Sequence, residues 1–465
     1  LEQTLHEMRA DYEAALATNV LIREHSVWSQ QAERDAGRLL LELDRAEEAR
    51  AVMQAALAKT SSLPLQAALH YHLGSAALAL QEHAEAERHL QQALDLHERI
   101  GGLKTRDALS TRNALAVVYF RTGRYDLAAS EHWEVFKARR DVLGPNHPHT
   151  LSSRVSLAIS EARNGHPAEA DAILSDVLPG YLRYYGKGHP EVAYVLRRRS
   201  EARAELGNGK GALEDGLKAL AIYVAHSGPY SERALNARIW VGVAAMRTGQ
   251  HQQALGELAR AVRDVHACGR GRDRLAGNAH AWYANALARS GQFSEALAEV
   301  AKAISVFQEL EEDAETRGAL RECLLLKGKI LAAEGRDDEA VQWLGRAYDM
   351  VLSEKGADDP ITQAYAVPLG TVLARTGDHA KAETLLRGVI TLAETGKLPK
   401  TDELVIDAAM ELSRVLDFAG KATELQRLID AFNLDVNDEG SPRLRMDRSF
   451  NYRGWNFSIG INADL

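Results

Sequence analysis

A glycine that returns at nearly constant intervals constrains the fold of this chain more than any other feature. Successive copies are 42 residues apart, except for one interval of 44 and one of 43. The copies are Gly123, Gly165, Gly207, Gly249, Gly291, Gly335, Gly377 and Gly420. Glycine adopts positive φ after a helix without steric cost, so each copy predicts a helix end followed by a tight turn.

Small residues accompany these glycines at two fixed distances. Seven residues before the first seven glycines stand Ala116, Ala158, Ser200, Gly242, Ala284, Gly328 and Gly370. Five residues after them stand Ala128, Ala170, Ala212, Ala254, Ala296, Ala340 and Ala382, whereas the last copy has Leu425. Small residues at fixed points allow two helices to approach closely, which predicts helical hairpins. A lone hairpin cannot bury its apolar face, so neighbouring hairpins are expected to stack.

The composition agrees with an all-α fold. The chain has 465 residues, of which 46% are hydrophobic and only 6% aromatic, with 11 prolines. Its net charge of -9 argues against a general nucleic-acid binder, which would show a basic face. Two cysteines, Cys268 and Cys323, are too few for a disulfide framework or a zinc site. No apolar run approaches the roughly 20 residues of a membrane span.

Three regions follow from the pattern. Residues 1–24 predict an N-terminal helix that caps the stack, residues 25–432 the repeats, and residues 433–465 a polar linker with a short β-like extension. Two looser copies of the motif, one with Ala49 and one with Gly74 and Ala86, bring the expected total to about ten hairpins. In the extension, Trp455, Phe457, Ile459 and Ile461 alternate with polar residues and glycine, which is the period of a strand.

The repeat resembles the tetratricopeptide repeat (TPR) family. Its small/large code is seen in Leu73-Gly74, Ala77, Ala86, Leu90 and Ala93, and again in Leu115-Ala116, Tyr119, Gly123, Tyr125 and Ala128. HEAT-type repeats have a similar period, but this position-specific code favours the TPR family. The resemblance implies a right-handed superhelical solenoid.

A loop sequence is similar to that of the kinesin-light-chain-like subclass, which has longer repeats than the usual 34 residues. The marker Gly-x-x-His-Pro reads Gly144-Pro145-Asn146-His147-Pro148 and Gly186-Lys187-Gly188-His189-Pro190, with a degenerate copy at 356–360. Proline suits the first position of a helix, where no N–H is needed.

One face of the first helix in each repeat carries the candidate binding residues. Seven positions separate Trp240 from Arg247, so the two lie roughly 20° apart around a helix. By the family resemblance this face lines a concave peptide groove. The expected groove residues are Asn236, Trp240, Arg247, Asn278, Trp282, Asn285, Arg289, Arg121, Arg163, Tyr194 and Arg197.

The chemistry of these residue types suits a peptide, although a structural role stays open. Asparagine offers one donor and one acceptor group to a peptide backbone, arginine grips a carboxylate, and tryptophan supplies apolar area. Arginine in the last turn of a helix also favours the helix dipole. Repeated residues can moreover be inherited without being used.

Sites for other chemistry are not expected. The close histidine pairs, His70/His72 and His147/His149, predict structural or surface roles, because helix residues two apart point to different sides. The stretch 207–212 matches G-x-G-x-x-A but follows a predicted helix, whereas a dinucleotide site needs a strand there. We therefore expect no catalytic, cofactor-binding or metal-ligating residues.

These observations predict a non-enzymatic, cytoplasmic scaffold that binds an acidic peptide segment. An alternative is the sensor or regulatory region of a larger bacterial signalling protein such as a kinase or transcription regulator. A periplasmic location is a further alternative if the chain is a fragment. Neither direct nucleic-acid binding nor a membrane span is expected, and the C-terminal extension could dock on the chain itself.

Overall fold

The computed structural model describes residues 11–13, 15, 29–310, 314–400, 402–432 and 434. Regular secondary structure in these residues is α-helical throughout. Residues 11–13 and 15 are helical, but most of the predicted capping helix and the β-like extension lie outside the described residues. None of the described helices combines the length and apolar character needed to cross a membrane.

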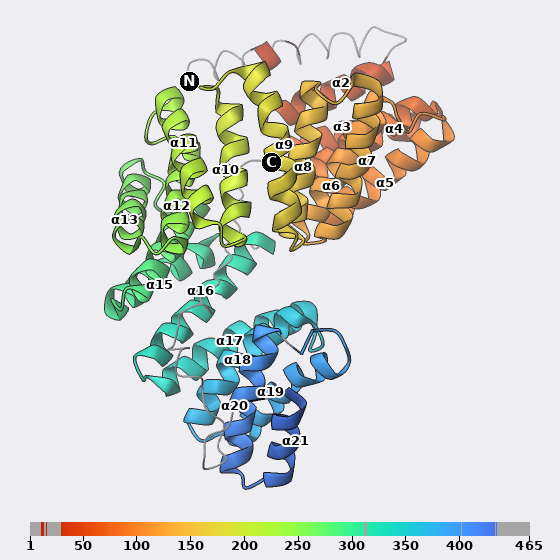
Figure 1. Ribbon diagram of the computed structural model, residues 1–465. Helices are drawn as coiled ribbons and strands as arrows, with labels where there is room; N and C mark the ends of the chain where they lie inside the picture. The colour runs from red at the N-terminus through yellow and green to blue at the C-terminus, as the bar shows by residue number, and fades with distance from the viewer. Residues whose placement is uncertain are drawn as a thin grey trace. The chain divides into compact units, whose positions relative to one another are not determined.

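Helices α2 to α21 form ten consecutive hairpins, which confirms the expected number for the described part of the chain. Two compact units divide them at Gly228 and Pro229. The first unit contains α2 (Ser29–Glu42), α3 (Ala46–Lys59), α4 (Leu63–Ala79), α5 (His83–Arg99), α6 (Arg106–Arg121), α7 (Tyr125–Leu143), α8 (Pro148–Arg163), α9 (Pro167–Tyr185), α10 (Pro190–Glu205) and α11 (Gly209–Ser227). The second contains α12 (Glu232–Arg247), α13 (His251–Ala267), α14 (Arg274–Arg289), α15 (Phe293–Glu309), α16 (Ala314–Ala333), α17 (Asp337–Lys355), α18 (Pro360–Arg375), α19 (His379–Glu394), α20 (Glu403–Phe418) and α21 (Ala422–Phe432) (Figure 1).

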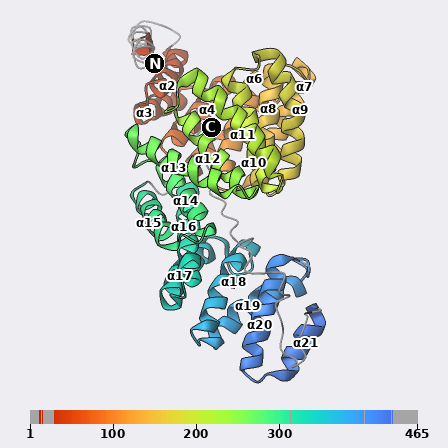
Figure 2. The same cartoon turned by 60° about the vertical axis from the view of Figure 1, so that its left-hand side comes forward.

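Neighbouring hairpins stack with their first helices in contact, as in the pairs α2 and α4, α4 and α6, and α8 and α10 of the first unit. In the second unit α12 packs against α14, α14 against α16, α16 against α18, and α18 against α20, in addition to the contacts within and between adjacent hairpins. Figure 2 shows the same succession of helix pairs from another side. The even-numbered helices therefore form an inner layer, and side chains on this layer from neighbouring repeats can meet.

The turn glycines adopt the predicted conformation. Their φ angles are all positive and run from 67° at Gly420 to 89° at Gly377. The two looser copies of the motif use other residues at this point: Asp44 has φ 58° and Gln81 has φ 61°. The left-handed turn is thus kept in the first two hairpins, at a steric cost that glycine avoids in the later ones.

Close packing explains the small residue before each turn. A Cβ atom added to Gly242 would lie 2.5 Å from Leu258 Cγ, and one added to Gly328 would lie 2.6 Å from Leu344 Cγ. The leucine of the second helix therefore fills the space that the small residue leaves in the first. The alanines five residues after the glycines are completely buried, from Ala128 to Ala382.

The Gly-x-x-His-Pro loop works as a helix cap. The Nδ1 atom of His147 accepts a hydrogen bond from the backbone N–H of His149 at 3.2 Å, and His189 accepts one from Glu191 at the same distance. In the degenerate copy Asp359 Oδ1 accepts from Ile361 at 2.7 Å. An acceptor side chain directly before the proline satisfies an N–H group that the helix leaves free. The structural role predicted for His147 is confirmed.

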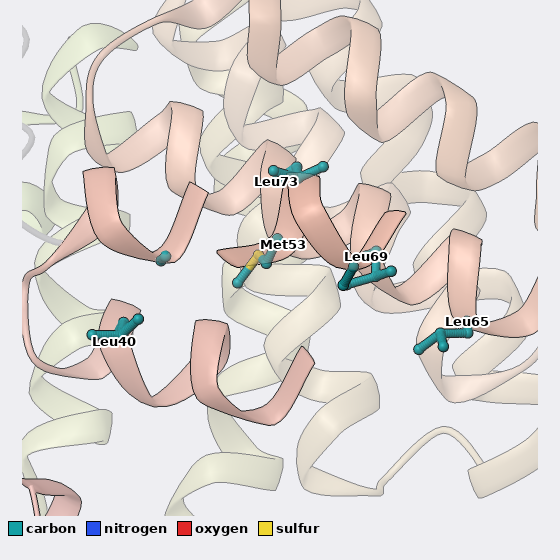
Figure 3. Close-up of a cluster of buried hydrophobic side chains, with 7 residues drawn as sticks. Leu40, Met53, Leu65, Leu69 and Leu73 are labelled. Atoms are coloured by element: carbon teal, nitrogen blue, oxygen red, sulfur yellow. The ribbon is translucent and has the colours of Figure 1, made fainter. Parts of the chain in front are cut away.

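The first two hairpins, α2 to α5, also bury apolar side chains where their helices meet. Leu40 of α2, Met53 of α3, and Leu65, Leu69 and Leu73 of α4 are buried in one cluster (Figure 3). A hairpin thus completes its core with the first helix of the next hairpin, as expected for stacked repeats.

Candidate peptide-binding face

The predicted binding residues of the second unit lie on two neighbouring first helices, α12 and α14, which pack against each other. They occupy equivalent places, because Asn278, Trp282 and Arg289 follow their counterparts in α12 by 42 residues. We call this set the Trp–Asn face: Asn236, Trp240, Arg247, Asn278, Trp282, Asn285 and Arg289.

The two tryptophans of this face form a pair. Their ring centroids are 6.2 Å apart and the ring planes are tilted by 52°. Trp240 is 7% exposed and Trp282 is 4% exposed, so both rings are largely withdrawn from water. Aromatic pairs at this separation contribute stability beyond their buried area, and they hold one wall of the face in place.

Beside the tryptophans lie polar atoms that are buried without hydrogen-bond partners. Asn278 and Asn285 are each 1% exposed. The Oδ1 atom of Asn278, both amide atoms of Asn285 and the indole Nε1 of Trp240 have no partner in the structure. A buried polar group left unsatisfied costs about 1–3 kcal/mol. Groups of this kind in a folded protein call for an explanation, such as a ligand or a water molecule that completes them.

The two arginines of the face are less buried than its tryptophans and asparagines. Arg247 and Arg289 are half-buried at the ends of α12 and α14. Burial lowers the pKa of Arg289 from its usual value, although a guanidinium remains charged at neutral pH. The face therefore combines apolar rings, amide groups and positive charge.

Comparison with known families identifies repeats that include some of the residues of this face. Tetratricopeptide-repeat models match residues 65–132 and 107–183, and further ones match residues 277–302 and 363–387. The chain contains tetratricopeptide repeats. Comparison with curated protein sequences gave no match.

Solved structures with TPR folds are similar to this chain at low sequence identity. A Podosopora anserina kinesin light chain with nearly identical TPR-like repeats is 21% identical, covers 42% of this chain and 96% of its own, and has a TM-score of 0.39. BtubC (BKLC) from P. vanneervenii is 19% identical, with coverages of 53% and 92% and a TM-score of 0.39. The quorum sensor NprR from B. thuringiensis, in its apo form, is 12% identical, with coverages of 75% and 99% and a TM-score of 0.56. The likeness to NprR concerns the fold alone.

In five repeats an arginine stands two residues before the turn glycine, and these arginines do not act as one set: Arg121, Arg163, Arg247, Arg289 and Arg375. The Arg163 guanidinium lies 5.7 Å from the centroid of the Tyr125 ring. Arg375 donates from Nε to Asp337 Oδ2 at 3.1 Å and from Nη2 to the Ala332 carbonyl oxygen at 3.2 Å. Tyr125 and Asp337 each begin the second helix of the preceding hairpin. At these two positions the arginine joins neighbouring repeats, which is the structural alternative left open by the sequence.

In the first unit, Tyr194 and Arg197 belong to a network on α10. The Tyr194 ring centroid lies 5.5 Å from the Arg197 guanidinium and 5.1 Å from that of Arg198. Both arginines donate to Glu201, at 2.5 Å and 3.1 Å. Burial opposes the charge of Arg198, but Tyr194 and Glu201 raise its pKa above the usual value. Arg121, also in the first unit, is half-buried and makes no ion pair within the described residues.

The sequence analysis missed a charged extension of the face in the next repeat. Glu322 and Lys329 of α16 stand 44 residues after Asn278 and Asn285, at equivalent positions. Burial raises the pKa of Glu322 and lowers that of Lys329. The Tyr365 hydroxyl of α18 donates to Glu322 and accepts from Arg321 Nε at 3.1 Å. The register of the repeat was the signal that could have found them.

Proposed function

We propose that the Trp–Asn face binds an extended peptide segment of a partner protein. The observation that carries this proposal is the set of buried polar atoms on Asn278, Asn285 and Trp240 that have no partner among the described residues. Because these atoms are buried, the proposal requires the side chains that cover them to move when the peptide binds. An extended backbone presents N–H and C=O groups in alternation. One asparagine can accept from the former and donate to the latter.

The other groups of the face suggest the character of the segment. Trp240 and Trp282 leave only narrow edges exposed, 7% and 4%, and these edges are apolar. Arg247 and Arg289 favour an acidic residue in the same segment, because guanidinium groups form two parallel hydrogen bonds with a carboxylate. TPR repeats supply the scaffold, and this proposal assigns no catalytic step to it.

The chain contains one segment rich in large apolar side chains outside the repeats, residues 443–465. It has Phe450, Trp455, Phe457 and Ile461, and Asp464 follows them. We include docking of this segment on the Trp–Asn face in the proposal because of its apolar side chains. Its charge does not favour the two arginines of the face, since Arg443, Arg445, Arg448 and Arg453 outnumber Asp447 and Asp464. A sensory role in a larger signalling protein stays a prediction of the sequence.

Fluorescence anisotropy can test the proposal with two probes. The first is a synthetic peptide of residues 443–465 added to the chain truncated after Pro442, and the second is the strongest binder from a random peptide library selected on the same chain. Trp282→Ala with Asn285→Ala should weaken binding at least about tenfold, the loss of roughly 1.4 kcal/mol. Arg247→Ala with Arg289→Ala should reduce both the affinity and its dependence on salt.

Trp343→Ala provides the matched control, because Trp343 lies on the second helix α17, where its ring contacts Lys327 at 3.6 Å. This variant should bind as the parent does. Binding of the library peptide but not of residues 443–465 would reject self-docking alone. If both face variants bind every probe as tightly as the parent, the whole assignment is wrong.

A further inference from the structure

Three side chains of types that can ligate a metal ion meet at the turn between α8 and α9 in the first unit. Glu161 lies in the last turn of α8, His166 directly precedes α9, and Glu169 lies in the first turn of α9. One ligand atom from each residue lies within 4.8 Å of the others. The Nδ1 atom of His166 is 2.8 Å from Glu161 Oε2.

The two carboxylates of this cluster have no cationic partner apart from the imidazole. Glu161 contacts His166, and Glu169 forms no ion pair within the described part of the chain. By contrast, Asp171 of α9 forms an ion pair with Arg203 at 2.8 Å. Arg163, the arginine nearest in sequence, is directed over the Tyr125 ring instead. The turn therefore gathers two carboxylates around one imidazole, and a bound cation can balance their negative charge.

We propose that Glu161, His166 and Glu169 bind a first-row divalent metal ion of the Zn²⁺ type. Zn²⁺ binds imidazole nitrogen and carboxylate oxygen at about 2.0–2.2 Å, so adjacent ligand atoms around it are about 3 Å apart. The observed spacing between Nδ1 and Oε2 is close to that value. Glu169 is exposed and can rotate to bring its carboxylate to the ion, while water completes the coordination. The imidazole favours zinc, nickel or copper over magnesium and calcium.

Binding would join the end of one helix to the start of the next. The ion replaces the proton between His166 and Glu161, so its affinity falls as the imidazole becomes protonated. Across the hairpin turn, the ion would restrain opening of α8 from α9. No other turn of the described repeats combines histidine with two glutamates in this way.

Isothermal titration of the full chain with ZnCl₂ tests the site. His166→Ala and the conservative Glu169→Gln should each weaken zinc binding at least about tenfold. That is the lower end of the loss in affinity seen when a residue that supports a metal ligand is removed. His251→Ala is the matched control, because His251 is an exposed histidine at the start of α13 without this pair of acids. It should leave the titration unchanged, and excess MgCl₂ should not compete.

Anomalous diffraction from zinc-soaked crystals of the full chain places the ion independently. A peak within bonding distance of His166 and the two carboxylates is expected. Equal zinc affinity in the parent, His166→Ala and Glu169→Gln would overturn the proposal, and so would a peak only at other histidines.

Discussion

Replacing Asn285 with leucine should stabilise the second unit and at the same time weaken peptide binding. The Asn285 side chain is 1% exposed, and neither of its amide atoms has a hydrogen-bond partner in the part of the chain that the structure describes. Each unsatisfied buried group costs about 1–3 kcal/mol, whereas an apolar side chain of similar size carries no such cost. We therefore expect Asn285→Leu to raise the free energy of unfolding by about 1–3 kcal/mol.

Urea denaturation followed by tryptophan fluorescence would measure this change, and hydrogen exchange in α14 would localise it, since repeats open locally. Asn236→Leu is the matched control. Asn236 is equally buried, at 2% exposed, but has an interaction partner, so its loss should leave stability unchanged or lower it. A lower urea midpoint for Asn285→Leu would refute the reasoning, because it would show that the amide is satisfied and structural.

Two further predictions concern packing and pH. Gly242→Val should lower the free energy of unfolding by about 1–3 kcal/mol in urea denaturation, because even its Cβ would lie 2.5 Å from Leu258 Cγ. Gly256→Ala is the control and should leave the free energy of unfolding unchanged, because its added methyl group meets nothing within 4 Å. Burial holds the pKa of His132 at about 4, below the ordinary 6.5, so the folded chain binds fewer protons than the unfolded one. The resulting stability is complete above pH 6.5 and is lost as the pH falls towards 4, with a magnitude of about 3 kcal/mol. His132→Gln, which can keep the contact with Ser160, should flatten the curve of stability against pH over this window, and an unchanged curve in thermal unfolding would contradict the assignment.

The repeat architecture could be predicted from the sequence because its signals are local. Gly123 and its counterparts mark turns through backbone sterics alone, and the small residues reveal which helices approach each other. The marker loop was recognisable as well. The capping bond from His149 to His147 became visible only in the structure, because a motif does not show which atom of the histidine ring accepts.

The candidate site was predictable only in part. Helix periodicity placed Trp240 and Arg247 on one face, and the repeat register placed Trp282 on the same face of the neighbouring helix. The partners of the arginines were not predictable, because Arg375 reaches Asp337, 38 residues earlier in the chain.

Local sequence thus determined where each helix ends, which residues share its face and how many hairpins there are. The tertiary structure alone decided which polar groups are satisfied. Asn236 and Asn278 occupy equivalent positions in the repeat, yet only the Oδ1 atom of Asn278 is buried without a partner. Likewise, Glu161, His166 and Glu169 meet because a left-handed turn brings two helices together. Burial and hydrogen bonding depend on side chains from neighbouring helices, and the spacing of residues along one helix does not contain that information.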